Sequence, residues 1–396
     1  MPNSIKQICN YNDCTGCCAC FNICAKQAIA MVEDSFGEIH PQIDENKCVG
    51  CKMCQQICPI NEPVEKNTPK YCFAAWSENI AFREKCASGG IASLLSKYVV
   101  EQGGVVYGAQ YDNCFNVKTV RASTLEELET FKGSKYTHCF VGNSFKKLQN
   151  DLQNGLLCLY ISTPCQVAGL RKYLKKKYDN LITADLICHG VSPNSYLKQE
   201  IELIKKENHI SKIDNVVFRC NSSKNFHLTF WEKGKLLFDK IWIHSFYFRA
   251  FLQGITLREN CYSCRFAEGL RVGDFTFGDF IGIADLVSEN EKQKVKNSSC
   301  VLINTEQGVK YWNLINQIYP IAYIEKTLSD AIKKSPSLKG AYPRHPLRNK
   351  FKYLFSKYSY NGAIRKLLGW RIYLDKSPIS YFYRIPNKII KKIRAK

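Results

Sequence analysis

Two rows of four cysteines with the same spacing fill much of the first 58 residues of the chain. Residues 14 to 24 hold the pattern Cys-x2-Cys-x2-Cys-x3-Cys, and residues 48 to 58 repeat it with a proline directly after the last cysteine. Three thiols spaced in this way can line one tight loop around a metal cluster, whereas the fourth thiol of each row must reach elsewhere. Zinc sites use two pairs of cysteines and not two rows of four, so the pattern favours iron-sulfur clusters over zinc or disulfides.

The spacing of both rows is that of bacterial two-cluster ferredoxins, in which the fourth cysteine of each row binds the cluster of the other row. We therefore expect two [4Fe-4S] clusters. The first is predicted to use Cys14, Cys17, Cys20 and Cys58. The second is predicted to use Cys48, Cys51, Cys54 and Cys24. Cys9 and Cys18 fall outside this register, and we expect both to be small buried or tolerated thiols without a ligand role.

The composition is that of a globular protein with an unusual number of cysteines. The chain is 45% hydrophobic and 23% charged, and no stretch approaches the roughly 18 consecutive apolar residues of a membrane span. Its first residues lack an apolar signal core, which predicts a cytoplasmic protein. In a reducing compartment, an odd total of 21 cysteines indicates metal binding or redox chemistry in place of disulfides.

The chain divides into three predicted parts, of which the cysteine module over residues 1–66 is the first. The second part is a body over residues 67–343, which begins within the proline-containing linker at 61–70. Apolar strands are predicted at 156–162 and 181–188, with a helix between them. Such strand-helix-strand units predict a sheet that is at least partly parallel. The expected fold class is an α/β (α+β) domain preceded by a small bacterial-type two-cluster ferredoxin domain.

Four cysteines of the body stand at positions suited to a third cluster. Cys165 follows Thr163 and Pro164 at the start of a predicted helix, where free amide groups and the helix dipole stabilise a thiolate or another anion. Cys188 ends a predicted strand, and a further pair is separated by two residues. The alternative is that these thiols are ordinary core cysteines. The third predicted ligand set is Cys165, Cys188, Cys261 and Cys264.

Five stretches of the body resemble the beta subunit of coenzyme F420-reducing hydrogenases and F420H2 dehydrogenases. They are SGGIASLL (88–95), KGSKYTHC (132–139), STPCQVAGLRKYL (162–174), LICHGVSP (186–193) and CYSCRFAEGLRVGDFTFGDFIG (261–282). They follow the order of that family over roughly residues 70–340. The resemblance implies a flavoprotein oxidoreductase in which FAD exchanges hydride with F420 or another organic substrate and single electrons with iron-sulfur clusters.

The resemblance also implies which residues meet the flavin and the substrate. The implied FAD contacts are Ser88, Gly89, Gly90, Ser134, Lys135, Thr163, Asp274 and Asp279. The implied catalytic residues are His189, as a proton carrier, and Lys135, facing the flavin. Structural roles are the alternative for both, as a packed histidine and a solvated lysine, and the two aspartates could instead cap turns. No GxGxxG fingerprint is present, so an ordinary Rossmann FAD site is not expected.

The implied partners are a redox protein such as a ferredoxin and a small-molecule hydride donor or acceptor. Bacterial relatives with this architecture accompany genes for surface polysaccharides, so polysaccharide biosynthesis is one implied setting. A second function fits the same module: a non-catalytic electron-transfer or docking protein that has lost its flavin and serves a neighbouring enzyme. The presence of the SGG, SKY and TPCQ stretches favours the enzyme.

The last predicted part, residues 344–396, is a basic segment with interleaved aromatic residues. It holds 15 Lys or Arg residues against one acid, Asp375, and so carries +14 of the net charge of +21. This composition fits a solvated tail, contact with the anionic inner face of the membrane, or docking to an acidic partner or polyanion. No recognition motif accompanies the charge, so nucleic-acid binding is not expected.

Overall fold

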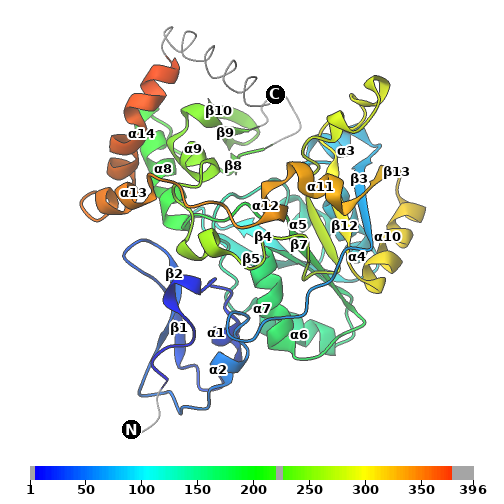
Figure 1. Ribbon diagram of the computed structural model, residues 1–396, viewed down its shortest axis with the longest axis horizontal. Helices are drawn as coiled ribbons and strands as arrows, with labels where there is room; N and C mark the ends of the chain where they lie inside the picture. The colour runs from blue at the N-terminus through cyan, green and yellow to red at the C-terminus, as the bar shows by residue number, and fades with distance from the viewer. Residues whose placement is uncertain (1–4, 220–225, 377–396) are drawn as a thin grey trace.

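The computed structural model describes residues 5–219 and 226–376 and is built around a mixed eight-stranded sheet (Figure 1). The strand order is β13-β3-β12-β11-β7-β6-β4-β5. The strands are β3 (Tyr71–Ser77), β4 (Val105–Tyr111), β5 (Val117–Ala122), β6 (Cys158–Ser162), β7 (Leu181–Leu186), β11 (Phe275–Asp279), β12 (Ser299–Ile303) and β13 (Ile321–Lys326).

The centre of this sheet is parallel and its two margins are antiparallel. Three pairs of strands are parallel: β4 with β6, β6 with β7, and β7 with β11. At one margin β5 pairs antiparallel with β4. At the other margin the pairs β11 with β12, β12 with β3, and β3 with β13 are antiparallel. The prediction of an α/β fold with a partly parallel sheet is confirmed. Because parallel strands end at one edge, the segments that follow β6, β7 and β11 meet at a common edge, where open α/β sheets bind ligands.

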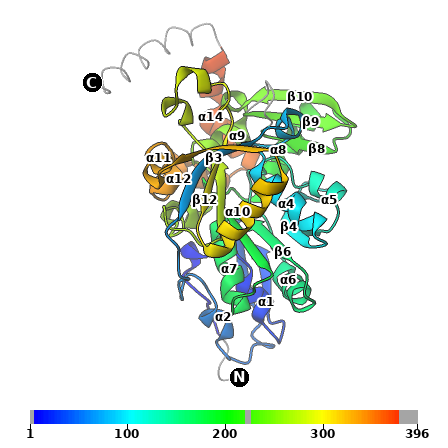
Figure 2. The same ribbon diagram turned by 90° about the vertical axis from the view of Figure 1, so that its right-hand side faces the viewer.

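Helices cover both faces of the sheet because apolar side chains alternate along its strands (Figure 2). Tyr107 and Tyr160 pack on one face with helices α6 and α7, while Val106 and Leu159 pack on the other with α4 and α10. These four helices are α4 (Ile91–Glu101), α6 (Ser144–Gln153), α7 (Pro164–Leu174) and α10 (Glu306–Ile318). Shorter helices lie in the connections: α3 (Ile80–Glu84), α5 (Leu125–Glu129), α11 (Leu328–Lys334), α12 (Pro336–Lys339), η4 (Ile283–Asp285) and η5 (Glu289–Glu291).

The cysteine module packs directly on helix α7 of the body (Figure 1). Its elements are η1 (Tyr11–Asp13), α1 (Ala19–Ile23), β1 (Ile29–Glu33), β2 (Ile39–Ile43) and α2 (Met53–Gln56). At the contact, a Cβ atom built on Gly169 would lie 2.9 Å from the sulfur of Cys17. Only glycine allows this approach, so the module and α7 share one continuous core.

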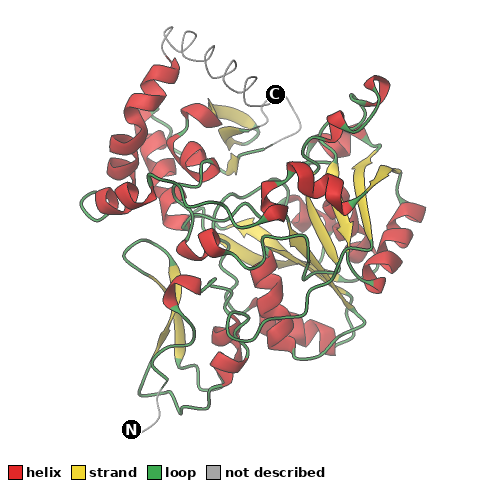
Figure 3. Cartoon of the chain, viewed as in Figure 1, coloured by secondary structure: helices red, strands yellow, loops and turns green. Residues whose placement is uncertain are grey.

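A second layer of the body contains a small sheet and several helices (Figure 3). The sheet has the order β10-β9-β8. The elements of this layer are α8 (Asn194–Glu207), β8 (Asn215–Val217), β9 (His227–Glu232), β10 (Lys235–Ile241), η2 (Trp242–His244), α9 (Phe246–Leu252), η3 (Glu259–Ser263), α13 (Arg348–Phe355) and α14 (Tyr360–Lys376). Helices α13 and α14 bury apolar side chains against α8 and α9.

Residues 344–376 therefore differ from the expected basic tail, since they form packed helices. Along α14, the buried residues recur every three or four positions, which is the spacing of one helix face. They are Tyr360, Ala363, Ile364, Leu367, Leu368 and Ile372. The high charge count concealed this apolar face, and Trp370 and Tyr373 are exposed on α14. Residues 377–396, with Tyr381, Phe382 and Tyr383, lie outside the described residues. In the described ranges, no helix has both the length and the apolar character needed to cross a membrane.

Candidate metal centres and cofactor site

The first predicted ligand set lies on the side of the cysteine module that faces the body. The loop after η1 turns through Gly16, whose φ of 65° suits glycine, and α1 then carries Cys20. Cys58 comes from the other row, directly after α2, and lies with the first row. One small cavity is lined by Cys9, Cys14, Cys17, Cys18, Cys20 and Cys58. This placement fits the predicted exchange of the fourth thiol between the rows.

Cys9 takes part in this group, although the spacing pattern left it unassigned. Side-chain hydrogen bonds join its thiol to those of Cys14 and Cys58. These hydrogen bonds lower the pKa of Cys14 and bring the pKa of Cys58 to about 7. A lowered pKa favours the thiolate, which is the form that binds iron. Cys9 is therefore a neighbour of the first ligand set that sequence reasoning missed.

The second predicted set lies closer to solvent. Cys54 is buried and interacts electrostatically with the thiols of Cys51 and Cys24, whereas Cys51 itself is exposed. The amide of Ala28 donates a hydrogen bond of 3.3 Å to the sulfur of Cys24. Cys48 is half-buried and packs against the same core. Cys24, the fourth thiol of the first row, is thus beside Cys51 and Cys54 of the second row.

These thiols are not arranged for a single metal ion. Within the described ranges, no three His, Cys, Asp or Glu side chains form a group that could hold one ion. A cube-shaped [4Fe-4S] cluster needs a wider arrangement, because each of its four thiolates binds a different iron atom. Thiols gathered around a shared cavity fit such a cluster better than a mononuclear site.

The third predicted set is also brought together, at the edge where β6 and β7 end. Cys165 lies in the first turn of α7, Cys188 follows β7, and η3 contains Cys261, with Cys264 directly after it. All four line one cavity. The hydroxyl of Thr163 lies 3.3 Å from the sulfur of Cys165. Segments far apart in the sequence therefore present four thiols to a common space.

The thiols of the third set have raised pKa values, which favour their protonated form. Burial, together with the neighbouring thiols, raises the pKa of Cys165 and of Cys188 to about 12. Burial likewise raises the pKa of Cys261. Without metal these thiols stay protonated, so binding of a metal cluster must release protons from them.

Two of the predicted flavin contacts meet where β11 ends. The hydroxyl oxygen of Ser88 lies 2.9 Å from that of Ser299, and Ser299 pairs with Asp279 between β12 and β11. Asp279 forms an ion pair with the buried guanidinium of Arg219. Ser134 reaches the same group through Tyr136, whose hydroxyl hydrogen-bonds with both Ser134 and Arg219. These residues form a polar group at the edge where β11 ends, which is the edge at which open α/β sheets generally bind ligands.

The two predicted glycines are required by close packing at the start of α4. A Cβ atom on Gly89 would lie 2.2 Å from the carbonyl oxygen of Ala75 and 2.8 Å from the amide of Ser299. Gly90 is the residue before the helix and has a φ of 89°. Glycine at both positions lets the helix begin directly beside Ser88 and Ser299.

Lys135 and His189 both occupy largely buried positions. The ammonium of Lys135 donates hydrogen bonds to the carbonyls of Phe131 and Lys132, at 3.2 and 3.0 Å, and burial lowers its pKa to about 8. The Nε2 atom of His189 lies 3.1 Å from the carbonyl oxygen of Phe251, and burial lowers the pKa of His189. His189 also lines the cavity of the third cysteine set.

Neighbouring aromatic rings connect the polar group at Asp279 with that cavity. The ring centroids of Tyr136 and Phe251 are 5.0 Å apart, and those of Phe251 and His189 are 5.1 Å apart. Of the other predicted flavin contacts, Thr163 lines the cysteine cavity itself. The implied flavin residues are therefore divided between two neighbouring groups. The rings of Tyr136, Phe251 and His189 join these groups, and we call these rings the aromatic wall.

Asp274 does not join either group. It precedes β11, whereas Asp279 ends that strand, so the two carboxylates lie at opposite edges of the sheet. One oxygen of Asp274 accepts hydrogen bonds from the amide and hydroxyl of Thr183, at 2.8 and 2.7 Å, and the other accepts from Thr305 at 2.7 Å. This placement corresponds to the alternative of a structural cap.

Two family models match most of the body. They are described as the N-terminal and C-terminal parts of the coenzyme F420 hydrogenase/dehydrogenase beta subunit, and they match residues 72–146 and 157–325. The chain belongs to this family. A third model, described as a 4Fe-4S dicluster domain, matches residues 13–61 and includes both cysteine rows. The resemblance read from the sequence is confirmed, and the chain is an iron-sulfur oxidoreductase subunit related to the F420 hydrogenase beta subunit.

Among solved structures, a chain of the xenon-derivatized F420-reducing [NiFe] hydrogenase complex from Methanosarcina barkeri is similar to this family member. The two share 16% sequence identity with a TM-score of 0.45, over 75% of this chain and 96% of the other. No curated protein matches the chain significantly.

Cys18 offers a test of the ligand register in this beta-subunit relative. Its sulfur lies 3.5 Å from the carbonyl oxygen of Gly16 and beside the backbone of Val141 and Gly142, where the module meets the body. We expect Cys18→Ser to leave iron content unchanged, because the sulfur faces the body backbone. Iron analysis of the purified variant checks this, and loss of about four irons would overturn the register.

Proposed function

We propose that the chain is an iron-sulfur flavoprotein oxidoreductase. It relays single electrons between the two [4Fe-4S] clusters of the cysteine module and FAD held by the body, and an organic substrate such as F420 exchanges hydride with the flavin. The observation that carries this proposal is the cavity lined by Cys165, Cys188, Cys261 and Cys264, which adjoins both the cysteine module and the aromatic wall leading to Asp279.

The contact between module and body supports a direct route for electrons. Cys17 touches Gly169 on α7, and Cys165 lies four residues earlier on the same helix. Positions four apart share one helix face, so the first and third ligand sets are neighbours along the same face of α7. The second set, with exposed Cys51, is the natural point of exchange with a redox partner protein such as a ferredoxin.

The body residues would hold FAD at the edge of the sheet. When bound, FAD supplies the conversion between a two-electron hydride and single electrons. Ser88, Ser134 and Thr163 would donate hydrogen bonds to it, while Asp279 fixes Arg219 at the same edge. Lys135, whose pKa burial lowers to about 8, can hold or release a proton at its Nζ atom. Surface-polysaccharide biosynthesis is the proposed setting for the organic substrate.

Anaerobic purification followed by iron, sulfide and flavin analysis tests this proposal. We expect about twelve irons and one FAD per chain, because three ligand sets are present. About eight irons without flavin after reconstitution would contradict the enzyme and favour the electron-transfer or docking protein. Cys261→Ala is the matched variant, and it should lose about four irons while both clusters of the cysteine module remain.

A further inference from the structure

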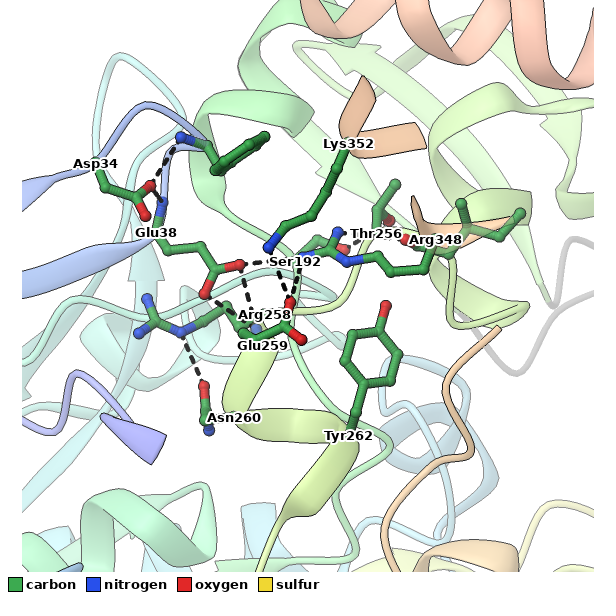
Figure 4. Close-up of polar contacts among 12 residues, drawn as sticks. Asp34, Glu38, Ser192, Thr256, Arg258, Glu259, Asn260, Tyr262, Arg348 and Lys352 are labelled. Carbon is green, nitrogen blue, oxygen red and sulfur yellow. Dashed lines mark hydrogen bonds and ion pairs between the residues drawn. The ribbon is translucent and has the colours of Figure 1, made fainter. Parts of the chain in front are cut away.

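A fully buried arginine stands where the cysteine module meets the body. Arg258 precedes η3 and has 0% relative exposure. Its Nη2 atom donates hydrogen bonds to the carbonyls of Cys14, at 3.1 Å, and Ile39, at 3.0 Å. Its Nε atom donates to Asn260 at 3.3 Å (Figure 4). Arg258 therefore reaches from the third ligand set to the backbone of the first.

The carboxylates of Glu38 and Glu259 are already paired with other cations. Glu38 forms an ion pair with Arg348 at 3.1 Å, and Glu259 forms one with Lys352 at 3.0 Å (Figure 4). Glu259 also pairs with Arg344. In the described part of the chain, Arg258 forms no ion pair, and its Nη1 atom has no hydrogen-bond partner. Within the described residues, its positive charge is thus buried without a carboxylate in ion-pair contact.

A buried guanidinium without a counter-charge is strongly unfavourable, so a negative group must lie near it when the protein is complete. Two thiol sets flank it. Its Nη2 atom donates to the carbonyl of Cys14 in the first set, and its own carbonyl accepts a hydrogen bond of 3.0 Å from the amide of Cys261 in the third set. Arg258 thus links the backbone of both sets.

We propose that Arg258 is the shared counter-ion of two iron-sulfur clusters, one at the first ligand set and one at the third, and that its charge raises the reduction potential of both. A cluster gains negative charge on reduction, and its potential follows the net charge and hydrogen bonding around it. The second ligand set includes exposed Cys51, so solvent screens it from Arg258. Electrons that enter at the second ligand set are then drawn toward the clusters of higher potential at the first and third sets. The inference rests on the proposed function, because it requires the third cluster.

Redox titration followed by electron paramagnetic resonance on the full anaerobic chain tests this inference. Arg258→Gln should lower the midpoint potentials of two clusters and leave the remaining one unchanged. Arg258→Lys keeps the charge and should restore most of both potentials. Arg344→Gln is the matched control, because it removes a partly exposed arginine from the far side of the same polar network and should shift neither potential. The unshifted signal should disappear when Cys51→Ala is added.

The outcomes separate this inference from the function itself. Full iron content in Arg258→Gln with unchanged potentials would overturn the counter-ion role, as would equal shifts in Arg258→Gln and Arg258→Lys. Arg258→Gln could also lose iron. In that case, an Arg258→Lys variant that keeps three clusters and wild-type potentials supports the role of charge. Loss of iron in both variants contradicts it. Absence of the third cluster from the wild-type chain would instead refute the proposed function.

Discussion

Replacing Asp185 with asparagine is expected to lower the free energy of unfolding of the body by about 3 to 5 kcal/mol. The Asp185 carboxylate is fully buried and accepts hydrogen bonds from Arg271 Nε and Nη2, at 3.1 and 2.6 Å, and from Thr276 at 2.7 Å. The amides of Val272 and Gly273 donate to its other oxygen, at 3.0 and 2.8 Å. Asparagine would leave Arg271 as a buried cation and turn an amide group toward these donors.

The same variant should also weaken the third ligand set. Arg271 donates to the carbonyls of Glu268 and Leu186, at 2.9 Å each, and so ties the segment after Cys264 to the end of β7, two residues before Cys188. Urea unfolding followed by circular dichroism measures the stability, and iron analysis measures the cluster.

Glu306→Gln is the matched control for this experiment. It removes an ion pair to Lys70 in which the glutamate is 83% exposed, and it should change the stability by less than about 1 kcal/mol. A change in stability with Asp185→Asn as small as that of this control would contradict the prediction, because the Asp185–Arg271 pair would then not stabilise the contact between the sheet and the segment after Cys264.

Local spacing made the cysteine module and much of the body predictable. Some features depend only on residues that are neighbours in the sequence, and these can be predicted from spacing. Examples are the four thiols in a fixed register and the helix that starts at Thr-Pro-Cys. The contacts that complete the sites join distant positions instead. Arg258 meets Cys14 across 244 residues, and Arg348 meets Glu38 across 310. No periodicity in the sequence indicates such pairs.

Two further differences follow from geometry that spacing alone does not show. Asp274 and Asp279 occur in one short motif, yet the strand between them carries their side chains to opposite edges of the sheet. The segment at 344–376 was expected to be a basic tail because its charges were counted, whereas its apolar residues recur at helical spacing and bury α14 against α8 and α9. Charge density describes the exposed face of a helix and not whether the helix packs.

The predicted exchange of ligands between the two rows leads to the second large effect. Cys58→Ala should remove one cluster, about four irons, although the other three cysteines of its own row remain. Cys58 is buried directly after α2, and the backbone of Ile60 and Asn61 lies within hydrogen-bonding range of its sulfur. The lost spectrum should be the one that disappears in Cys14→Ala, and the spectrum removed by Cys51→Ala should stay.

Cys9→Ser is the matched control, since Cys9 adjoins both Cys14 and Cys58 and lines the same cavity. Its single S–H can donate a hydrogen bond to either of the two neighbouring thiolates, and serine preserves a donor at that position, so iron content should remain at the wild-type level. Iron loss in Cys9→Ser with retention in Cys58→Ala would make Cys9 the fourth ligand of the first cluster. The ferredoxin spacing argues against that result, because it fixes the fourth ligand in the partner row and leaves the fifth thiol as a neighbour.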